Sequence, residues 1–534
     1  MSPAPFLCSD GPLIVSPERA RSTKRPGFLA SLRGLLALVL ATGAAVMATA
    51  AEGELRGLWV DGFHAGFRNP TEVTQLVATA RAGGFNTLLV EVRRRGDAFY
   101  SSDLEPRAAE VEAGFDPLRT LLDCAHAESG GPRLGVHAWL VAFNIWNHET
   151  RRPPQTNHPY LRHPDWLTRT RSGRTWDGAN YAFDPGHPAV QEHTFQVGME
   201  LVRRYDIDGL HLDYIRYAGP EWGYHPLAVA RFNRAYDRSG TPPPTDAAWR
   251  QFRRDQVSAL VRRIYLHAHA EKPDLIVSAA TIAFAPGIRE RLQWSSSAAY
   301  AHVLQDWRAW MEEGILDWNL PMLYFREAAD GASLTDWLRF VSTHQYRRRA
   351  AAGLGFYLNS FAATEAQIER ARACASDDSP GLIGFCAYSY ANLATDLPHS
   401  NAVERLERLV RPGEQAGPPA NVVPTPAQPA STLSGTGHLM GYVRQSGNLE
   451  PIEGAELLLV AGDALLLATD ANGFFGRVDL EPGNYPLTVS APGYSDQATS
   501  VVVRGDRSVA RLDLVLKRSE VVAGPPESPP AKSE

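Results

Sequence analysis

The stretch Asp206-Ile-Asp-Gly-Leu-His-Leu-Asp-Tyr-Ile-Arg-Tyr-Ala-Gly219 contains an apolar run between a polar turn and a Gly-Pro loop. This pattern predicts a strand over Gly209–Tyr214. Side chains alternate along a strand, so His211 and Asp213 share one face. Burying these polar groups costs free energy unless solvent exposure, a charge or hydrogen-bond partner, or a functional role offsets that cost. In a parallel α/β barrel Asp213 would lie at the strand end where catalytic side chains sit, and the alternative is that it caps the loop or pairs with Arg216.

On both sides of this stretch, strand-like apolar runs alternate with helical patterns between residues 55 and 411. The runs are Leu55–Asp61, Thr87–Val92, Gly135–Ala142, Gly209–Tyr214, Ile276–Ala280, Trp318–Tyr324, Leu354–Tyr357 and Leu382–Tyr388. Helical patterns include Pro70–Ala82, Pro188–Tyr205, Ala247–His269 and Thr364–Ala375. Eight strands separated by helices predict an α/β fold, a (β/α)8 TIM barrel with long loops. A doubly wound sheet is the alternative, but no GxGxxG turn follows the first strand.

The N-terminal 51 residues have the pattern of a targeting segment. Five basic residues precede the apolar run Gly34–Met47, and Ala48-Thr-Ala50 follows it. A basic region, an apolar region and an A-x-A site together indicate a secretory signal peptide. The run is shorter than the roughly 20 residues that a membrane span needs. We therefore expect residues 1–51 to be removed, and an exported chain, periplasmic or extracellular, without a membrane span.

The composition changes after the barrel. Residues 412–437 are rich in Pro, Ala, Ser and Thr and predict an extended linker. In residues 438–517, apolar and polar residues alternate over short runs, and turn signals separate the runs. This pattern predicts a small all-β sandwich. The expected strands are Leu439–Val443, Glu456–Val460, Ala464–Thr469, Gly476–Asp479, Tyr485–Ser490 and Ser508–Leu516. The tail, 518–534, is rich in Pro, Ser and charge and is expected to be disordered.

Overall charge and missing motifs exclude several function classes. A net charge of −6 and a pI near 6.3 give no support for a nucleic-acid partner. Four cysteines without a CxxC pair argue against a disulfide framework or a zinc ribbon. No HExxH, GxSxG or P-loop motif occurs, and the pair His267-Ala-His269 lies in a helical pattern, where residues two apart do not face each other. We expect neither a metal nor an organic cofactor.

Polar and aromatic side chains gather where the predicted strands end. They are Asp61, Glu91, Arg93, His137, Trp139, Asn144, His211, Asp213, Tyr324 and Glu327. A sugar-processing site needs one acid to protonate the leaving oxygen and one carboxylate to attack or to activate water. Aromatic rings stack on sugar faces, although each ring alone also fits core packing. The set therefore predicts a sugar-processing cleft that works by carboxylate chemistry.

Several segments, in combination and in order, carry a family resemblance. They are Leu55-Arg-Gly-Leu-Trp-Val60, Gly84-Phe-Asn-Thr87, Glu91-Val-Arg-Arg-Arg-Gly-Asp-Ala-Phe-Tyr100, Val136-His-Ala-Trp139, Phe183-Asp-Pro-Gly-His187, Asp208-Gly-Leu-His-Leu-Asp-Tyr214, Gln305-Asp-Trp307 and Asp317-Trp-Asn-Leu-Pro-Met-Leu-Tyr324. Residues 52–411 resemble the bacterial glycosyl hydrolase-like 10 family. The resemblance implies an exported TIM-barrel glycoside hydrolase, and its best-understood relatives act on peptidoglycan glycan strands, including strands without stem peptides.

The resemblance also implies roles for individual residues. The family's aspartate at the end of the fourth strand falls on Asp213, as nucleophile or essential carboxylate. Glu327 and Glu91 are both candidates for the general acid/base. Glu327 is slightly preferred because it follows a strand end, whereas Glu91 can instead pair with Arg93. Substrate-binding roles are expected for Asp61, Arg93, His137, Trp139, Asn144, His211 and Tyr324. The loop Leu140–Trp146 lacks the Asn-Pro-Tyr-Arg motif of many family members, so the sugar subsite that it lines is expected to differ from theirs.

Residues 438–517 resemble a carboxypeptidase-regulatory-like module, a transthyretin-type sandwich. The segments that carry the resemblance are Gly441-Tyr-Val443, Pro451-Ile-Glu-Gly-Ala455, Thr469-Asp-Ala-Asn-Gly-Phe-Phe475 and Leu480-Glu-Pro-Gly-Asn-Tyr485. Such modules are mostly accessory, so binding of glycan or the cell surface and stabilisation of the enzyme both stay open. The rival to an enzyme is a non-catalytic glycan-binding barrel at the cell envelope.

Overall fold

The computed structural model describes residues 53–284, 287–288, 291–375, 379–410, 435–461 and 463–519. The predicted signal peptide 1–51, nearly all of the predicted linker 412–437, and all but two residues of the predicted tail 518–534 lie outside these ranges. Among the described residues, no helix combines the length and the apolar character that crossing a bilayer requires.

Eight parallel strands form a closed barrel. In chain order they are β1 (Leu55–Val60), β2 (Thr87–Arg93), β3 (Gly135–Val141), β6 (Gly209–Asp213), β7 (Ile276–Ile282), β8 (Trp318–Leu323), β10 (Ala352–Gly355) and β11 (Gly384–Tyr388). Each strand pairs with its neighbour in this order, β11 pairs with β1, and the pairing of β10 with β8 closes the ring. The short β9 (Arg349–Ala350) also pairs with β8, and the two-stranded sheet β4 (Asn144–Trp146) and β5 (Tyr181–Ala182) lies in the loop after β3. The predicted (β/α)8 barrel is confirmed.

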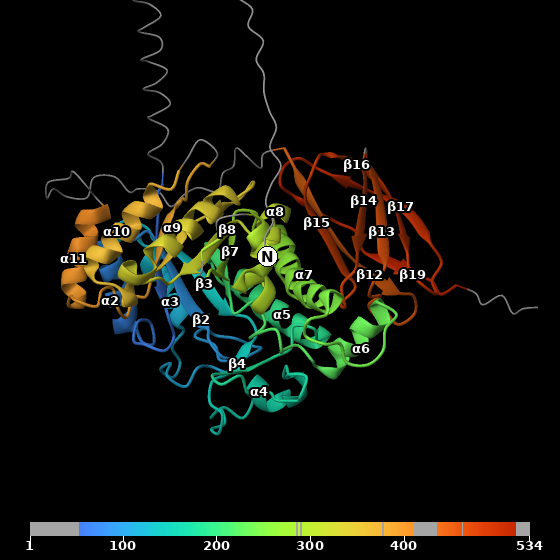
Figure 1. The fold of residues 1–534 in the computed structure, drawn as a ribbon, viewed down its shortest axis with the longest axis horizontal. Helices are drawn as coiled ribbons and strands as arrows, with labels where there is room; N and C mark the ends of the chain where they lie inside the picture. Colours follow the sequence, from blue (N-terminus) through green and yellow to red (C-terminus); the bar gives the residue numbers. More distant parts are fainter. Residues whose placement is uncertain are drawn as a thin grey trace, which may run out of the picture. The chain divides into compact units, whose positions relative to one another are not determined.

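Helices connect the strands and surround them (Figure 1). They are α2 (Pro70–Ala82), α3 (Pro117–His126), α4 (Pro159–Arg162), α5 (Pro188–Arg204), α6 (Pro226–Ala235), α7 (Ala247–Glu271), α8 (Trp307–Glu313), α9 (Glu327–Thr343), α10 (Phe361–Arg372) and α11 (His399–Val410). Short segments of other helix types occur at η2 (Glu128–Gly130), η3 (Pro164–Trp166), η4 (Arg291–Ser296), η5 (Ala298–His302) and η6 (Phe356–Leu358). The sequence sets several of these starts: Asn69 accepts a hydrogen bond from the Glu72 N–H before a proline at the first position of α2, and Asp246 accepts one from the Trp249 N–H at α7.

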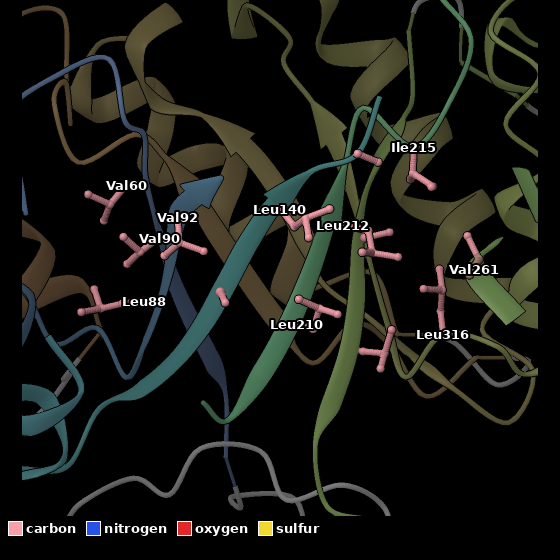
Figure 2. Close-up of a cluster of buried hydrophobic side chains, with 14 of the residues drawn as sticks. Val60, Leu88, Val90, Val92, Leu140, Leu210, Leu212, Ile215, Val261 and Leu316 are labelled. Atoms are coloured by element: carbon pink, nitrogen blue, oxygen red, sulfur yellow. The ribbon is translucent and has the colours of Figure 1, made fainter. Parts of the chain in front are cut away.

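The alternation of side chains along the strands creates two apolar layers. One layer lies between the barrel and its helices, and Figure 2 shows part of it, with Leu88, Val90 and Val92 of β2 and Leu210 and Leu212 of β6. The other fills the barrel interior with large rings, namely Trp59, Trp139 and Trp318, together with Leu89, Leu320 and Cys386. The predicted separation of Leu210 and Leu212 from His211 and Asp213 is therefore observed. Full burial of each aliphatic side chain contributes about 1.5–3 kcal/mol.

The C-terminal domain is a sandwich of two sheets. One contains β15 (Phe474–Leu480), β12 (Gly437–Gln445), β18 (Val509–Arg511) and β19 (Leu514–Leu516). The other contains β14 (Asp463–Ala468), β13 (Glu456–Ala461), β16 (Gly483–Ser490) and β17 (Gln497–Val503). Two details differ from the prediction: β17 was not expected, and the single strand Ser508–Leu516 is two strands, both parallel to β12. The backbone between them passes close to Gly441, where a Cβ would lie 1.7 Å from the Leu512 carbonyl oxygen.

The sandwich packs on the barrel helix α7, which contacts β12, β15 and β18. The Tyr442 hydroxyl on β12 accepts a hydrogen bond from Arg263 Nε at 3.2 Å and lies 3.1 Å from His267 Nε2. A buried ion pair joins Arg348 to Asp479 at 3.1 Å. Barrel and sandwich belong to one compact unit.

Candidate active site

Asp213 is the last residue of β6 and is only 4% exposed. Its Oδ1 accepts a hydrogen bond from the Tyr214 N–H at 2.6 Å and lies 3.4 Å from Arg216 Nη1. Burial raises the pKa of Asp213, while Arg216, the Tyr214 N–H and Trp139 act in the opposite direction. Tyr214 itself has φ 46° and lies under the Arg216 guanidinium, 4.1 Å from the ring centre. The carboxyl therefore has donors that favour its charged form.

Glu91 lies on β2, at the same end of the barrel, and is 3% exposed. Its Oε2 accepts the Gly62 N–H at 2.7 Å, from the loop after β1. Burial raises the pKa of Glu91 well above its ordinary value, and the charges of Asp61 and Asp213 raise it further. By strand register Glu91 is level with Trp139 and His211, and Asp213 lies two residues beyond His211 on the same face of β6. Two buried carboxyl groups thus interact at this rim, and their surroundings differ.

Aromatic rings from β1, β3 and β11, and one that follows β8, meet beside this pair. Tyr388, the last residue of β11, stacks on Tyr324 with ring centres 5.2 Å apart. It also contacts Trp59 and Trp139 edge-on, at 6.2 and 6.4 Å. Burial raises the pKa of the Tyr388 hydroxyl, and so do the charges of Asp61, Glu91 and Asp213. Sequence reasoning missed Tyr388, although it ends the eighth predicted strand and the same strand-end argument that selected Tyr324 would have found it.

His211 is fully buried and supports the interior of the barrel. The Trp59 indole N–H donates to its Nε2 at 3.0 Å, and its Nδ1 lies 2.9 Å from Ser278 Oγ. An indole nitrogen can only donate, so we assign the imidazole proton to Nδ1, which donates to Ser278. Burial lowers the pKa of His211 well below its ordinary value. The neutral ring fixes Trp59 in the layer beneath the carboxyl pair.

His137 lies deeper in the barrel than Asp213 does. It is opposite Gly209, the first residue of β6, four residues and therefore ~13 Å before the strand end at Asp213. A Cβ on Gly209 would lie 2.5 Å from its Nδ1, so the glycine makes room for the ring. The ring stacks on Trp318, its two nitrogens have no hydrogen-bond partner among the described residues, and burial lowers its pKa to about 4.

Arg93 belongs to a buried ion pair. Its guanidinium donates to both carboxylate oxygens of Glu105, at 2.9 and 2.7 Å, and His193 lies 2.9 Å from the same carboxylate. The register of β2 against β3 shifts between Glu91 and Arg93, so the two side chains do not follow the simple alternation of a strand. The anticipated alternative, a pair between Glu91 and Arg93, is not what the structure contains.

Glu327 is the first residue of α9, and its carboxylate pairs with Arg370 of α10. The same carboxylate lies beside Gly331 of α9, so it is held between α9 and α10 in the helix layer. Of the three candidate carboxyl groups, the structure therefore brings together Asp213 and Glu91.

The remaining predicted residues lie around the same rim. Asp61 follows β1, accepts the backbone N–H groups of Phe63 and His64 and lies 2.7 Å from His64 Nδ1. Asn144 begins β4, pairs with Ala182 and is 9% exposed. Within the described ranges, no group of three or more His, Cys, Asp or Glu side chains is arranged to hold a metal ion.

Each of the two domains matches a known protein family. The model of the family described as Glycosyl hydrolase-like 10 matches residues 54–357, and that of the Carboxypeptidase regulatory-like domain matches residues 438–517. Glycosyl hydrolase YngK of Bacillus subtilis (strain 168) is 25% identical over 291 residues, 50% of this chain and 52% of that protein. Glycosyl hydrolase DigH of Escherichia coli (strain K12) is 27% identical over 303 residues, 51% of this chain and 63% of that protein. This chain thus spans only part of each relative.

Among solved structures, the glycoside hydrolase domain of PgaB (BpsB) from Bordetella bronchiseptica aligns with a TM-score of 0.47 and 13% identity, covering 66% of this chain and 99% of that domain. The family model covers more than half of the chain and includes the strands that carry Glu91 and Asp213. The chain belongs to the glycosyl hydrolase-like 10 family.

Proposed function

We propose that this protein is an exported glycoside hydrolase that cleaves the glycan strands of peptidoglycan or a related bacterial envelope polysaccharide. The observation that carries the proposal is the pair of buried carboxyl groups, Glu91 and Asp213, at the C-terminal end of the barrel. Glycosidic cleavage requires two carboxyl groups in different protonation states, and sites achieve this by giving the two groups different surroundings.

The surroundings suggest which group takes which role. Glu91 is buried beside two other carboxylates, which favours its neutral form, so it is the proposed general acid that protonates the leaving oxygen. Asp213 is buried too, but the Tyr214 N–H and Arg216 stabilise its negative charge. It is the proposed carboxylate that attacks the anomeric carbon or activates water. The rings of Tyr324 and Tyr388 offer an aromatic surface beside the pair for a sugar face.

The substrate and the location rest on different observations. The family and the names of its relatives support cleavage of glycosidic bonds. Peptidoglycan is proposed because the sequence resembles a family whose best-understood members act on its glycan strands. Export, to the periplasm or the cell exterior, is proposed from the basic and apolar pattern that ends at Ala48-Thr-Ala50.

Digestion of purified glycan strands by the full chain tests the proposal. Wild-type protein should release soluble saccharides, while Asp213→Asn and Glu91→Gln should each lower kcat by about 10²–10⁴-fold. Glu327→Gln is the matched control, because it changes a carboxyl group on the same side of the barrel that is paired with Arg370. It should retain activity close to that of the wild type.

Two results would contradict the proposal. If Glu327→Gln abolishes activity and Glu91→Gln does not, the acid is assigned to the wrong residue. If the wild type releases nothing from glycan strands or other bacterial polysaccharides but binds them, the protein is a glycan-binding barrel.

A further inference from the structure

The two sheets of the sandwich differ in how their outward side chains are covered. In the inner sheet, which contains β12 and β15, Leu439 and Val443 pack in the sandwich core. Met440 and Tyr442 of the same strand point the other way and are buried against the barrel, where α7 contacts β12 and β15. The barrel therefore explains the apolar side chains on the outward side of the inner sheet.

The outer sheet, β14-β13-β16-β17, has apolar residues on both sides of two of its strands. Leu457 and Leu459 of β13 are buried in the sandwich core, whereas Leu458 and Val460 of the same strand point outward. The sequence of β14, Asp-Ala-Leu-Leu-Leu-Ala, repeats this pattern. A sheet with one face in water normally alternates apolar and polar residues. These two strands do not alternate, which predicts that a partner covers their outward side.

We define the outer face as the outward side chains of β13, β14, β16 and β17. Its large apolar members are exposed, Leu458 by 43%, Val460 by 49%, Leu466 by 59% and Val502 by 61%. Leu458 is directly opposite Leu466 on β14 and Thr488 on β16. Thr488 in turn is opposite Ala498 on β17, so uncharged surface is continuous across all four strands. Contiguous exposed apolar surface is typical of an interaction site, whereas single exposed apolar side chains are ordinary.

The chemistry of the outer face narrows the kind of partner. Within these four strands, the outward positions hold one charged residue, Glu456 at the start of β13, and no aromatic residue. Sugar rings pack on aromatic side chains, so the outer face does not suit a glycan. A partner recognised by charge needs opposite charges, which the outer face lacks. An uncharged sheet suits a second uncharged sheet, because two right-twisted sheets pack face to face at about −30°.

We propose that the outer face binds the outer face of a second copy of this chain, which forms a symmetric dimer. Two copies meet without burying an unpaired charge at the centre of the interface, and two-fold homodimers are the commonest soluble oligomers. Dimerisation in this arrangement is independent of the proposed activity, because the inner sheet lies between the interface and the barrel.

The size of the outer face sets the strength of the dimer. Four strands of six to eight residues have a footprint of roughly 400 Å². Two such faces bury at least about 800 Å² in total, compared with about 1,200–2,000 Å² in stable complexes. The interface therefore falls among weak, reversible ones, and we expect a dissociation constant in the micromolar range.

Sedimentation equilibrium of residues 53–534, which hold both domains in one compact unit, tests the dimer. With loading concentrations from about 1 to 100 µM, the mass of the wild type should rise from that of one chain to that of two. Leu458→Glu places a carboxylate from each copy in the interface. It should raise the dissociation constant at least about 100-fold, because like charges that lose water repel each other. Thermal melting of the variant should match that of the wild type, because Leu458 is exposed in the single chain.

Val515→Glu is the matched control, because Val515 is also an outward apolar strand residue, 46% exposed, but belongs to β19 of the inner sheet. It should change the dissociation constant less than about 3-fold. Val502→Glu, on the edge strand β17, is a second probe of the outer face. It should raise the dissociation constant at least about 10-fold, and it decides the question if Leu458→Glu does not fold.

Cosedimentation with two probes tests the other occupants of the outer face. The probes are purified glycan strands and vesicles of phosphatidylethanolamine with phosphatidylglycerol, each mixed with protein dilute enough to be monomeric. Leu458→Glu should bind each probe as the wild type does. If Leu458→Glu loses binding to either probe, the outer face belongs to a glycan or a membrane and the proposal is overturned. Wild-type protein that stays monomeric at the highest loading overturns it too, and so does a dimer with the same dissociation constant in Leu458→Glu.

Discussion

Replacing Glu91 by glutamine should make the protein more stable at neutral and alkaline pH while removing its proposed activity. Burial and the charges of Asp61 and Asp213 raise the pKa of Glu91 well above its ordinary value. An unfolded glutamate titrates near 4.3. Between that value and the raised pKa, the folded protein keeps a proton that the unfolded chain has lost. Stability must then fall as pH rises through this window.

The size of the effect follows from proton linkage. One extra proton in the folded state changes the free energy of unfolding by about 1.4 kcal/mol for each pH unit across the window. Below the window both states are protonated, and Glu91 contributes no pH dependence. Glutamine has nearly the same shape and keeps an oxygen for the Gly62 N–H, but it does not ionise. Any fixed cost of the substitution does not vary with pH.

Urea denaturation of wild type and Glu91→Gln from pH 4 to pH 9 measures the difference. We expect the free energy of unfolding of the variant, relative to that of the wild type, to rise by about 1.4 kcal/mol per pH unit above pH 4.3. The difference should level off at the pKa of folded Glu91. The same pKa should mark the alkaline limb of the kcat/KM profile, where the general acid loses its proton. A stability difference that does not change with pH would show that Glu91 titrates as an ordinary glutamate, and the argument for its role as acid would fail.

Three further predictions concern stability. Arg93→Met should lower the free energy of unfolding by about 3–5 kcal/mol, measured by urea denaturation, because it leaves Glu105 buried without its main partner. Trp59→Phe removes the donor to His211 Nε2 and should cost about 1–3 kcal/mol in the same assay, with far-UV circular dichroism unchanged. Tyr442→Phe removes the hydroxyl that two α7 side chains contact and should likewise cost about 1–3 kcal/mol, and limited proteolysis should then release the sandwich faster than in the wild type.

Much of the fold follows from local patterns. The strand over Gly209–Tyr214 was predicted from an apolar run between turn signals, and the observed β6 ends one residue earlier. The helix Pro70–Ala82 was predicted with its observed bounds, because a cap and a proline mark its start. In the sandwich, β17 was missed, because its central Thr-Ser segment and the neighbouring turns gave no clear alternation. Its pairing with β16 along seven residues is a long-range interaction that local propensity does not contain.

The sequence by itself determined that carboxyl groups and aromatic rings collect at one end of a parallel barrel, because a period of two along each strand and a shared strand direction suffice for that inference. Only the tertiary structure decided which charges meet. Glu327 was the slightly preferred acid from sequence, yet its carboxylate pairs with Arg370, 43 residues away. Arg93 and Arg95 are two residues apart, yet one has a carboxylate partner and the other has none among the described residues. The two members of such an ion pair come from separate segments of the chain. The distance between them is set when the barrel closes, not by their spacing in the sequence.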